Sequence, residues 1–306
     1  MSYTLPGGLQ AFTDEMSFEL ISRAVLQTSV MDYATIRSGL KSGNTTINLL
    51  DADIAVADRA CGWNEAGTLS FSQVNIDIQE KQTKQALCPT SLRDYYLSQK
   101  LSASAHAEEV PYAEVVSNLF VEKIRKWNED YLGSTIQTQI VTNNAVPALD
   151  CADSGQTVAS TSATIVDDVM DLIDAVPSRV LDRDDLGVIM APSYYNMLRR
   201  ALIAQNLFHF NPADTNSNVE LVMPGTDFKV IKSSGFSASA SYPAVTGASF
   251  IAGPLKDIVV GVGLESDDEM LKIFYSADND EVRVMSMWRL GLGVTDTTVF
   301  ARNGTL

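Results

Sequence analysis

The chain has 306 residues, of which 45% are hydrophobic and 20% charged, so it is long enough to bury one large core or two smaller ones. Its formal net charge of −16 argues against a nucleic-acid reader, whose affinity would come from Lys and Arg set against phosphates. No stretch approaches the roughly 18 continuous apolar residues of a membrane span, and the start lacks a secretory signal, so we expect a cytoplasmic protein. Three scattered cysteines, Cys61, Cys88 and Cys151, predict free thiols rather than a disulfide framework.

The first third of the chain predicts an extended arm followed by a projecting ribbon. Apolar residues within 13–27 fall near helical spacing, which indicates one short helix in the arm. Between Thr45 and Ala86 apolar and polar residues alternate, with the last apolar strand position at Ile78, and the glycines of Gly62–Gly67 predict a turn between two strands. An isolated ribbon is only marginally stable in water, so we expect it to lean on another segment, and a neighbouring copy is a candidate.

One long helix is predicted from Pro111 to Leu132, where apolar residues recur three and four positions apart. Pro111 suits the first turn, and Gly133 predicts the C-terminal end. At about 1.5 Å per residue, such a helix is roughly 33 Å long.

A compact α/β unit is predicted in the middle of the chain. A second helix at Ile165–Val176 is followed by a short buried strand at Gly187–Ala191 and by a third helix. The apolar residues of this third helix are Tyr195, Leu198, Leu202 and Ile203. The Ser, Ala and Gly residues of 233–249 then indicate a loop or a boundary.

The last fifty residues, 257–303, predict long strands that leave no room for a catalytic loop. Val259, Val260 and Val262 lead into an acidic turn, and 270–275 then alternate with period two. A second acidic turn precedes a strand whose apolar residues share one face: Val282, Val284, Trp288, Leu290, Leu292 and Val294. Its opposite face holds Arg283, Met285, Met287 and Arg289. Such a ribbon exposes a long edge that other chain segments or other subunits must cover.

The motifs of catalysis and cofactor binding are missing from the sequence. His106 and His209 are the only histidines, and neither lies in a metal-ligand pattern. The glycine pairs at 261/263 and 291/293 follow or interrupt strands without opening a helix, so a dinucleotide site is not predicted. Asp182–Gly187 resembles a calcium loop but lacks the bidentate Glu at its end, which favours a solvated turn. We therefore assign no catalytic, cofactor-binding or metal residue, although 38 acids always offer carboxylate pairs.

An arm, a ribbon, one long helix, an α/β unit and returning strands, in that order, resemble the HK97-fold major capsid proteins of tailed bacteriophages. Two segments of the sequence carry the resemblance. They are GVIMAPSYYNMLRRAL, beginning at Gly187, and the closing strands from Ile258 to Gly304. The implied fold is α+β and HK97-like, with an N-terminal arm, an extended β-hairpin loop, a long spine helix, and peripheral and axial domains.

The resemblance also implies a division of the chain. Residues 1–40 are expected to be the N-terminal arm, 41–87 the extended loop, 88–135 the peripheral domain with the spine helix, and 136–254 mainly the axial domain. Residues 255–306 are expected to return and complete the sheets. Some relatives crosslink a lysine of the extended loop to an asparagine of a neighbour. That chemistry is not carried over here, because no partner asparagine can be aligned with Lys41, Lys81 or Lys84.

The function implied is that of a major capsid protein. It is expected to associate with itself as hexamers and pentamers, and to meet a portal and a separate scaffolding protein. The resulting icosahedral shell would enclose double-stranded DNA without sequence-specific binding and without a cofactor or a membrane. The expected location is the virion capsid, after assembly in the cytoplasm of the host bacterium.

Two alternatives stay open, and one contact surface is predicted. A nanocompartment shell of the same fold would enclose protein cargo, and an enzyme of unknown type is the alternative from a different class. Trp63, Leu69 and Phe71, near the tip of the predicted ribbon, are candidates for intersubunit contact, although packing within their own subunit is an equal reading.

Overall fold

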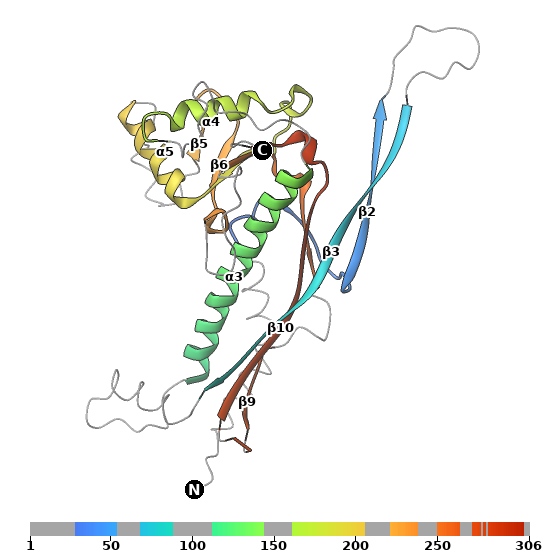
Figure 1. Ribbon diagram of the computed structural model, residues 1–306, viewed down its shortest axis with the longest axis vertical. Helices are drawn as coiled ribbons and strands as arrows, with labels where there is room; N and C mark the ends of the chain where they lie inside the picture. The colour runs from blue at the N-terminus through green and yellow to red at the C-terminus, as the bar shows by residue number, and fades with distance from the viewer. Residues whose placement is uncertain are drawn as a thin grey trace, which may run out of the picture.

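The computed structural model describes residues 28–53, 68–87, 112–143, 161–205, 221–237, 250–263, 271–276, 278–279 and 281–302. The helix predicted within 13–27, the ribbon turn at Gly62–Gly67, both histidines and all three cysteines lie outside these residues. The described elements form two sheets and three α-helices (Figure 1).

The larger sheet has six strands in the order β1–β8–β10–β3–β2, and β9 pairs with the first half of β10. Its strands are β1 (Thr35–Arg37), β2 (Gly43–Asp53), β3 (Thr68–Leu87), β8 (Ile258–Val262), β9 (Leu271–Ser276) and β10 (Glu281–Val294). The predicted alternation in β10 is confirmed, because Val284, Trp288 and Leu290 are buried while Arg283 and Arg289 are partly exposed. The long edge of β10 was expected to need a covering partner. From Val282 to Leu292, that partner is the chain's own β3.

Helix α3 (Tyr112–Asn143) has 32 residues and is therefore about 48 Å long. The prediction that it ends at Gly133 is wrong, because this glycine serves a close contact inside the helix. A Cβ on Gly133 would lie 2.4 Å from the carbonyl carbon of Gly235, in the short 3-10 helix Ser234–Phe236. The segment 233–249, predicted as a loop, thus begins with a buried contact on α3.

Helix α3 covers one face of the larger sheet. Trp288 donates a hydrogen bond from its indole N–H to Asn128 Oδ1 at 3.0 Å, and its ring meets that of Trp127 edge to face. Gln139 donates to the carbonyl of Leu292 at 3.0 Å and accepts the N–H of Val294 at 2.9 Å. Leu292 is the last residue of β10 that pairs with β3. Gln139 therefore forms its hydrogen bonds with the backbone of β10 where the pairing of β10 with β3 ends.

The smaller sheet confirms the α/β unit predicted in the middle of the chain. Its strand order is β11–β7–β4–β6–β5, and β4 and β6 are parallel. The strands are β4 (Leu186–Met190), β5 (Leu221–Val222), β6 (Lys229–Lys232), β7 (Phe250–Pro254) and β11 (Ala301–Arg302), and the helices are α4 (Ile165–Asp174) and α5 (Pro192–Ala204). Ile203 lies in α5 as predicted, at the last turn of the helix, where it is 52% exposed.

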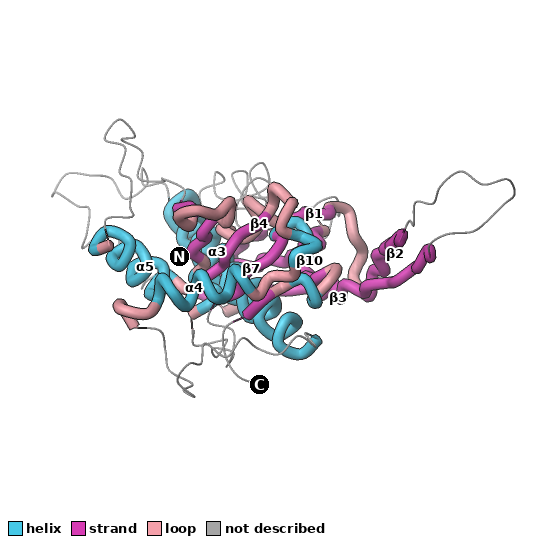
Figure 2. Tube along the Cα trace, turned by 90° about the horizontal axis from the view of Figure 1, so that it is seen from above, coloured by secondary structure: helices cyan, strands magenta, loops and turns pink. Residues whose placement is uncertain are grey.

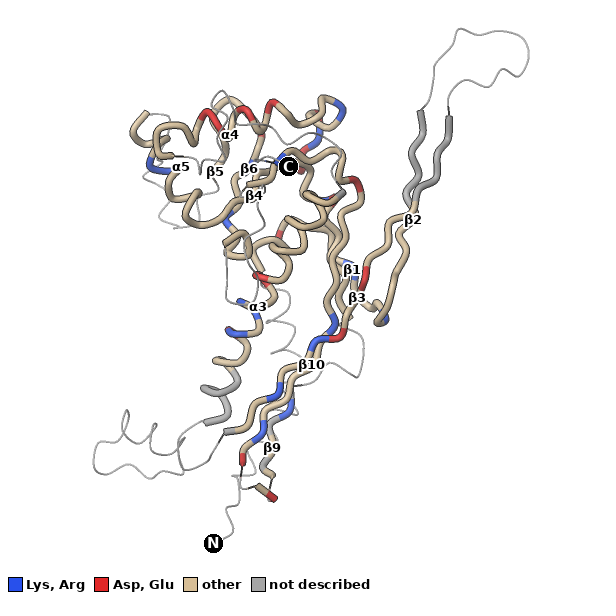
Figure 3. The backbone as a smooth tube through the Cα atoms, viewed as in Figure 1, with Lys and Arg blue, Asp and Glu red and all other residues tan. Residues whose placement is uncertain are grey.

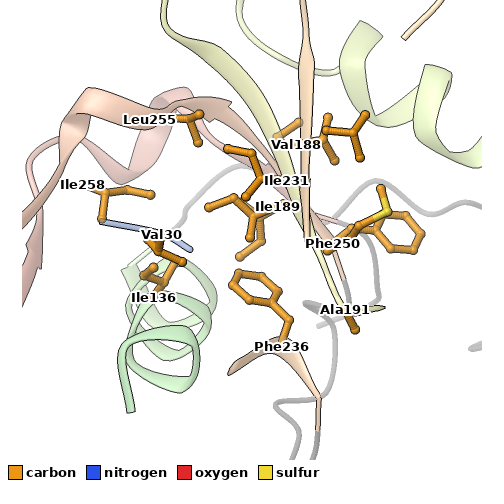
Figure 4. Close-up of a cluster of buried hydrophobic side chains, with 14 of the residues drawn as sticks. Val30, Ile136, Val188, Ile189, Ala191, Ile231, Phe236, Phe250, Leu255 and Ile258 are labelled. Atoms are coloured by element: carbon orange, nitrogen blue, oxygen red, sulfur yellow. The ribbon is translucent and has the colours of Figure 1, made fainter. Parts of the chain in front are cut away.

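One buried cluster connects the two sheets. Figure 4 shows Val30, Ile136 of α3, Ile189 of β4, Phe236 and Ile258 of β8 lying close together. A buried polar contact fixes the same region, since Glu129 of α3 accepts hydrogen bonds from the Ser29 N–H and the Ser233 hydroxyl, both at 2.8 Å.

An ion-pair network also links the sheets, and it includes the turn that resembles a calcium loop. Arg183 donates to both carboxylate oxygens of Asp185, at 2.7 and 2.8 Å, and to those of Asp257, at 3.0 and 3.1 Å. Burial raises the pKa of Asp257 more than Arg183 lowers it. Burial acts in the same direction on Asp185, but the hydrogen bonds and charge of Arg183, with the Lys256 N–H, leave its pKa below the usual range. The Asp185 carboxylate is thus engaged by Arg183.

Candidate interaction surfaces

The most prominent surface is the ribbon formed by β2 and the first half of β3. The two strands pair from Gly43 opposite Ile78 to Asp53 opposite Thr68. Eleven residues of β2 at about 3.3 Å each give a ribbon of roughly 36 Å. Figures 1 and 2 show that it projects away from α4 and α5. The predicted two-stranded ribbon is therefore confirmed over its described residues.

The ribbon is held at its root by a small apolar cluster. Ile47, Ile76, Ile78 and Val259 are buried together, and Leu40 packs against them. On the opposite face of the ribbon, polar side chains connect the two strands. Thr46 donates to Asn75 at 3.0 Å, and Gln73 donates to Asn48 at 3.0 Å. Such cross-strand pairs stabilise the ribbon without any apolar partner.

The predicted contact residues stand at or beyond the outer end of this ribbon. Trp63 lies outside the described residues. Leu69 and Phe71 belong to β3, where the backbone register sets Leu69 opposite Ala52 and Phe71 opposite Leu50. Phe71 stands three residue pairs, and Leu69 five residue pairs, beyond the pair of Ile47 and Val74 at which the root cluster ends. Their contact with another subunit stays a prediction.

Within the described residues, the ribbon has two backbone edges without a strand partner. The outer edge of β2 is one, because β2 ends the strand order of the sheet. The other is the edge of β3 opposite β2 from Thr68 to Ile76, since β10 pairs only with residues from Asp77 onward. Unpaired N–H and C=O groups in a row are a template for pairing with another chain.

A groove lies between the second half of β3 and the first half of α3, with a volume of about 530 Å³. Its apolar lining comes from Leu119, Phe120, Ile124, Trp127 and Trp288. Leu119 is 53% exposed there, although it is one of the apolar residues that recur three and four positions apart along the helix. An exposed leucine beside aromatic rings can bind an apolar segment of another molecule.

Lys81 closes one side of this groove. Its ammonium lies 4.8 Å from the ring centre of Tyr131 and 5.7 Å from that of Trp127, within the range of cation–π attraction. It also donates a hydrogen bond to Gln79 Oε1. Burial lowers the pKa of Lys81, and the charge of Asp77 offsets part of that shift.

The groove also adjoins an unpaired strand edge. β3 pairs with β10 through residues 77–87, and in the described part of the chain no strand pairs with its other edge from Gln79 to Leu87. Apolar side chains next to free backbone groups are the two features with which a sheet edge binds an extended segment.

Charge differs between the ribbon and the groove. The described ribbon residues 43–53 and 68–76 include Asp51 and Asp53 and no base. The groove, by contrast, is lined by Lys81, Lys123 and Glu80. Figure 3 shows Lys and Arg along the lower parts of β3 and β10, and acidic residues along α4. The groove and the ribbon are thus weakly complementary in charge.

The glycine pairs that superficially suggested a nucleotide site have a structural role. Gly261 lies in β8, and Gly291 and Gly293 lie in β10, so these three glycines are strand residues. In the described residues no group of three His, Cys, Asp or Glu could hold a metal ion. Nor does any helix among them combine the length and apolar character needed to cross a bilayer.

No protein-family model matches the sequence, and no curated protein matches it. Solved structures do match. The capsid of cyanophage P-SCSP1u has a TM-score of 0.57, at 9% identity, over 90% of this chain and 86% of that chain. The capsid of a native GTA particle has a TM-score of 0.54, at 12% identity, over 100% of this chain and 94% of that chain. A virus-like particle from Pyrococcus furiosus has a TM-score of 0.53, at 11% identity, over 95% and 99%.

The chain has the fold of a phage capsid protein. The likeness inferred from the order of elements and from the closing strands is confirmed, and it extends over nearly the whole chain. At 9 to 12% identity the shared property is the backbone arrangement rather than any set of side chains.

Sequence reasoning found the ribbon but missed the groove. The helix side of the groove was visible in the spacing of Leu119, Phe120 and Trp127. The strand side, Glu80–Gln85, lies inside the range 45–86 that was predicted to form strands, but it is polar and follows the last apolar strand position at Ile78. Its pairing with β10, which places it beside α3, is what no local pattern could indicate.

Proposed function

We propose that the chain is the major capsid protein of a tailed bacteriophage, which assembles in many copies into an icosahedral shell around double-stranded DNA. The observation that carries this proposal is the capsid fold over nearly the whole chain, together with a ribbon that projects beyond the subunit's own sheet. Copies that wrap one another gain interface area without enlarging their cores. The work of such a protein is done by interfaces, and we assign it no catalytic residue.

In this proposal the parts of the chain have the roles that the resemblance implies. Residues 1–40 are the arm, 41–87 the extended loop, and α3 the spine helix. The helix continues past residue 135, where the peripheral and axial portions were divided, so it joins the two. Residues 255–302 contribute strands to both sheets, which supports their role of completing them.

The contact between copies is proposed to run through the ribbon. Its outer end, with Trp63, Leu69 and Phe71, would reach a neighbouring subunit and lie against the groove beside α3. Two observations support this pairing: both surfaces have unpaired backbone edges, and the described residues of the ribbon carry only acidic charge while the groove holds two lysines. Hexamers and pentamers, a portal and a separate scaffolding protein belong to the same proposal, as do the virion location and assembly in the host cytoplasm.

A ribbon deletion tests the proposal. Because Ile47 stands directly opposite Val74, residues 48–73 can be replaced by the dipeptide Asn-Gly, which closes two antiparallel strands in a tight turn. The root cluster of Ile47, Ile76 and Ile78 is retained. The parent chain is expected to form particles by electron microscopy and gel filtration. The shortened chain should keep its circular dichroism and melting temperature and should form none.

The outcomes that would contradict the proposal are specific. A parent chain that stays a compact monomer at high concentration in several salts would refute shell assembly. A shortened chain that still builds normal particles would refute the role of the ribbon. A shortened chain that unfolds would mean that the ribbon belongs to the subunit's own core.

A second function within the same fold is a shell around protein cargo. This candidate is kept because the Pyrococcus furiosus match, which covers 99% of that chain, is to a virus-like particle and not to a phage capsid. The two functions differ in what the particles contain. Particles purified from the native source, treated with nuclease and then opened, should release DNA under the main proposal and a second protein under the alternative.

A further inference from the structure

The point at which the ribbon leaves the sheet is formed by two isoleucines that pack over glycine positions of β8 and β10. β3 pairs with β10 up to Asp77 and with β2 from Ile78 back toward Thr68, so Ile76 and Ile78 flank the change of partner. Their exposed fractions are 0% and 1%. The orientation of these two side chains therefore fixes the direction in which the ribbon continues.

The isoleucines fit because the facing residues are glycines. A Cβ on Gly293 would lie 2.6 Å from Ile76 Cγ1, and a Cβ on Gly291 would lie 2.5 Å from the Asp77 carbonyl oxygen. Ile78 reaches across β10, since its Cδ1 lies 3.2 Å from the position of a Cβ on Gly261 in the next strand. A side chain at Gly291 or Gly293 would collide with β3, whereas one at Gly261 would meet only the ends of the Leu40 and Ile78 side chains, at 3.1 and 3.2 Å.

A small shift at the contact between Ile76 and Gly293 becomes a larger displacement at the far end of the ribbon. Restoring an ordinary separation of about 3.6 Å requires a shift of roughly 1 Å at Ile76. Relative to Ile78, two residues and thus about 6.6 Å away, that shift tilts the strand by roughly 9°. At the end of the described ribbon, about 30 Å further out, the displacement is about 4 to 5 Å.

We propose that the packing of Ile76 and Ile78 over Gly293, Gly291 and Gly261 sets the angle of the ribbon and thereby the curvature at which neighbouring copies join. The first half of this inference concerns the single chain, and the second rests on the shell function proposed above. These glycines are positioning residues, because they act on the neighbour through the ribbon and do not touch it.

The test uses Gly293→Ala, whose Cβ meets only a side chain, and the double variant Gly293→Ala with Ile76→Ala, which removes the atom that is struck. Gly187→Ala is the matched control, since its Cβ would lie 2.6 Å from Leu255 Cδ1 in the smaller sheet, away from the ribbon. The ribbon angle is read in the unassembled full chain as the distance between spin labels at Asn48→Cys and Lys272→Cys. The three native cysteines are first replaced by serine.

We expect Gly293→Ala to shift the label distance by several ångströms, the double variant to restore it, and Gly187→Ala to leave it unchanged. Particles of Gly293→Ala should differ in diameter from the parent particles or fail to close. Ile76→Ala alone should broaden the distance distribution, which keeps the test decisive if Gly293→Ala does not fold.

Two results would overturn the inference. The first is an unchanged distance distribution in Gly293→Ala, or in Ile76→Ala where the former does not fold. The second is a shifted angle with particles of parental diameter, which would separate the ribbon angle from curvature. A parent chain that forms no particles would instead contradict the shell function, while the label distances would still decide the geometric half.

Discussion

Alanine at Gly133 is a sharp test of the packing between α3 and the segment that follows β6. From helix propensity alone, Gly→Ala in a helix interior stabilises by about 0.8–1 kcal/mol. The structure predicts the opposite sign. The added Cβ would lie 2.4 to 2.6 Å from the carbonyl carbon, Cα and oxygen of Gly235, all of which are backbone atoms that cannot turn away. The two segments would have to separate by about 1 Å.

The magnitude follows from these two terms. Overpacking a buried contact costs typically about 1–3 kcal/mol, and the upper end applies here because both sides are backbone. After the gain in propensity, the free energy of unfolding should fall by about 2 kcal/mol. Urea unfolding of the unassembled chain, followed by tryptophan fluorescence, measures it, because Trp127 and Trp288 lie where α3 meets the larger sheet.

The matched control is Ser134→Ala, the next residue of the same helix, which is partly exposed and gains propensity without a clash. Its unfolding midpoint should stay at or above that of the parent. If Gly133→Ala were as stable as the parent or more so, the close approach of α3 to Gly235 would be refuted, and Gly133 would be an ordinary helical glycine.

Two further predictions concern polar contacts. Gln139→Leu should lower the free energy of unfolding by about 1–3 kcal/mol, because both hydrogen bonds to the end of β10 are lost. Thr138→Ala, at the exposed neighbouring residue, should change it by less than about 0.5 kcal/mol. Equal urea midpoints for the two variants would contradict the role of Gln139. Asp185→Asn should lower the free energy of unfolding by about 1 kcal/mol at pH 7, a value discounted because Arg183 is partly exposed. The loss should become smaller as the pH falls below about 4, because the lowered pKa of Asp185 means that its ionised form stabilises the fold. Asp257 has the opposite sign: its pKa is raised, so its contribution is present at low pH and is lost as the pH rises, and Asp257→Asn should cost less than Asp185→Asn at pH 7. The reverse order of the two urea midpoints would refute this reasoning.

The sequence predicted those elements whose pattern follows their own burial. The apolar positions of β10 and of α4 alternate or recur because each faces a core on one side, and period alone identifies such elements. β4 is buried throughout and follows a polar turn, which is a recognisable signature of a central strand.

The sequence could not predict the elements that other segments impose. Residues 79–87 alternate no apolar side chains, and they extend β3 only because β10 pairs with them. Gly133 was misread as a helix end because a glycine required by a tertiary contact is indistinguishable in sequence from a glycine that terminates a helix. The groove was missed for the same reason, since half of it is made by this imposed strand.

The continuity of β3 determines how the subunit bears a mechanical load. This single strand of 20 residues pairs with β2 in the ribbon through its first half and with β10 through its second half. Hydrogen bonds in an antiparallel pair run perpendicular to the strands, so a pull along β3 shears all eleven residue pairs with β10 together instead of opening them one at a time. A subunit that is pulled through its ribbon should therefore resist a force directed along β3 far better than a force directed across the strands.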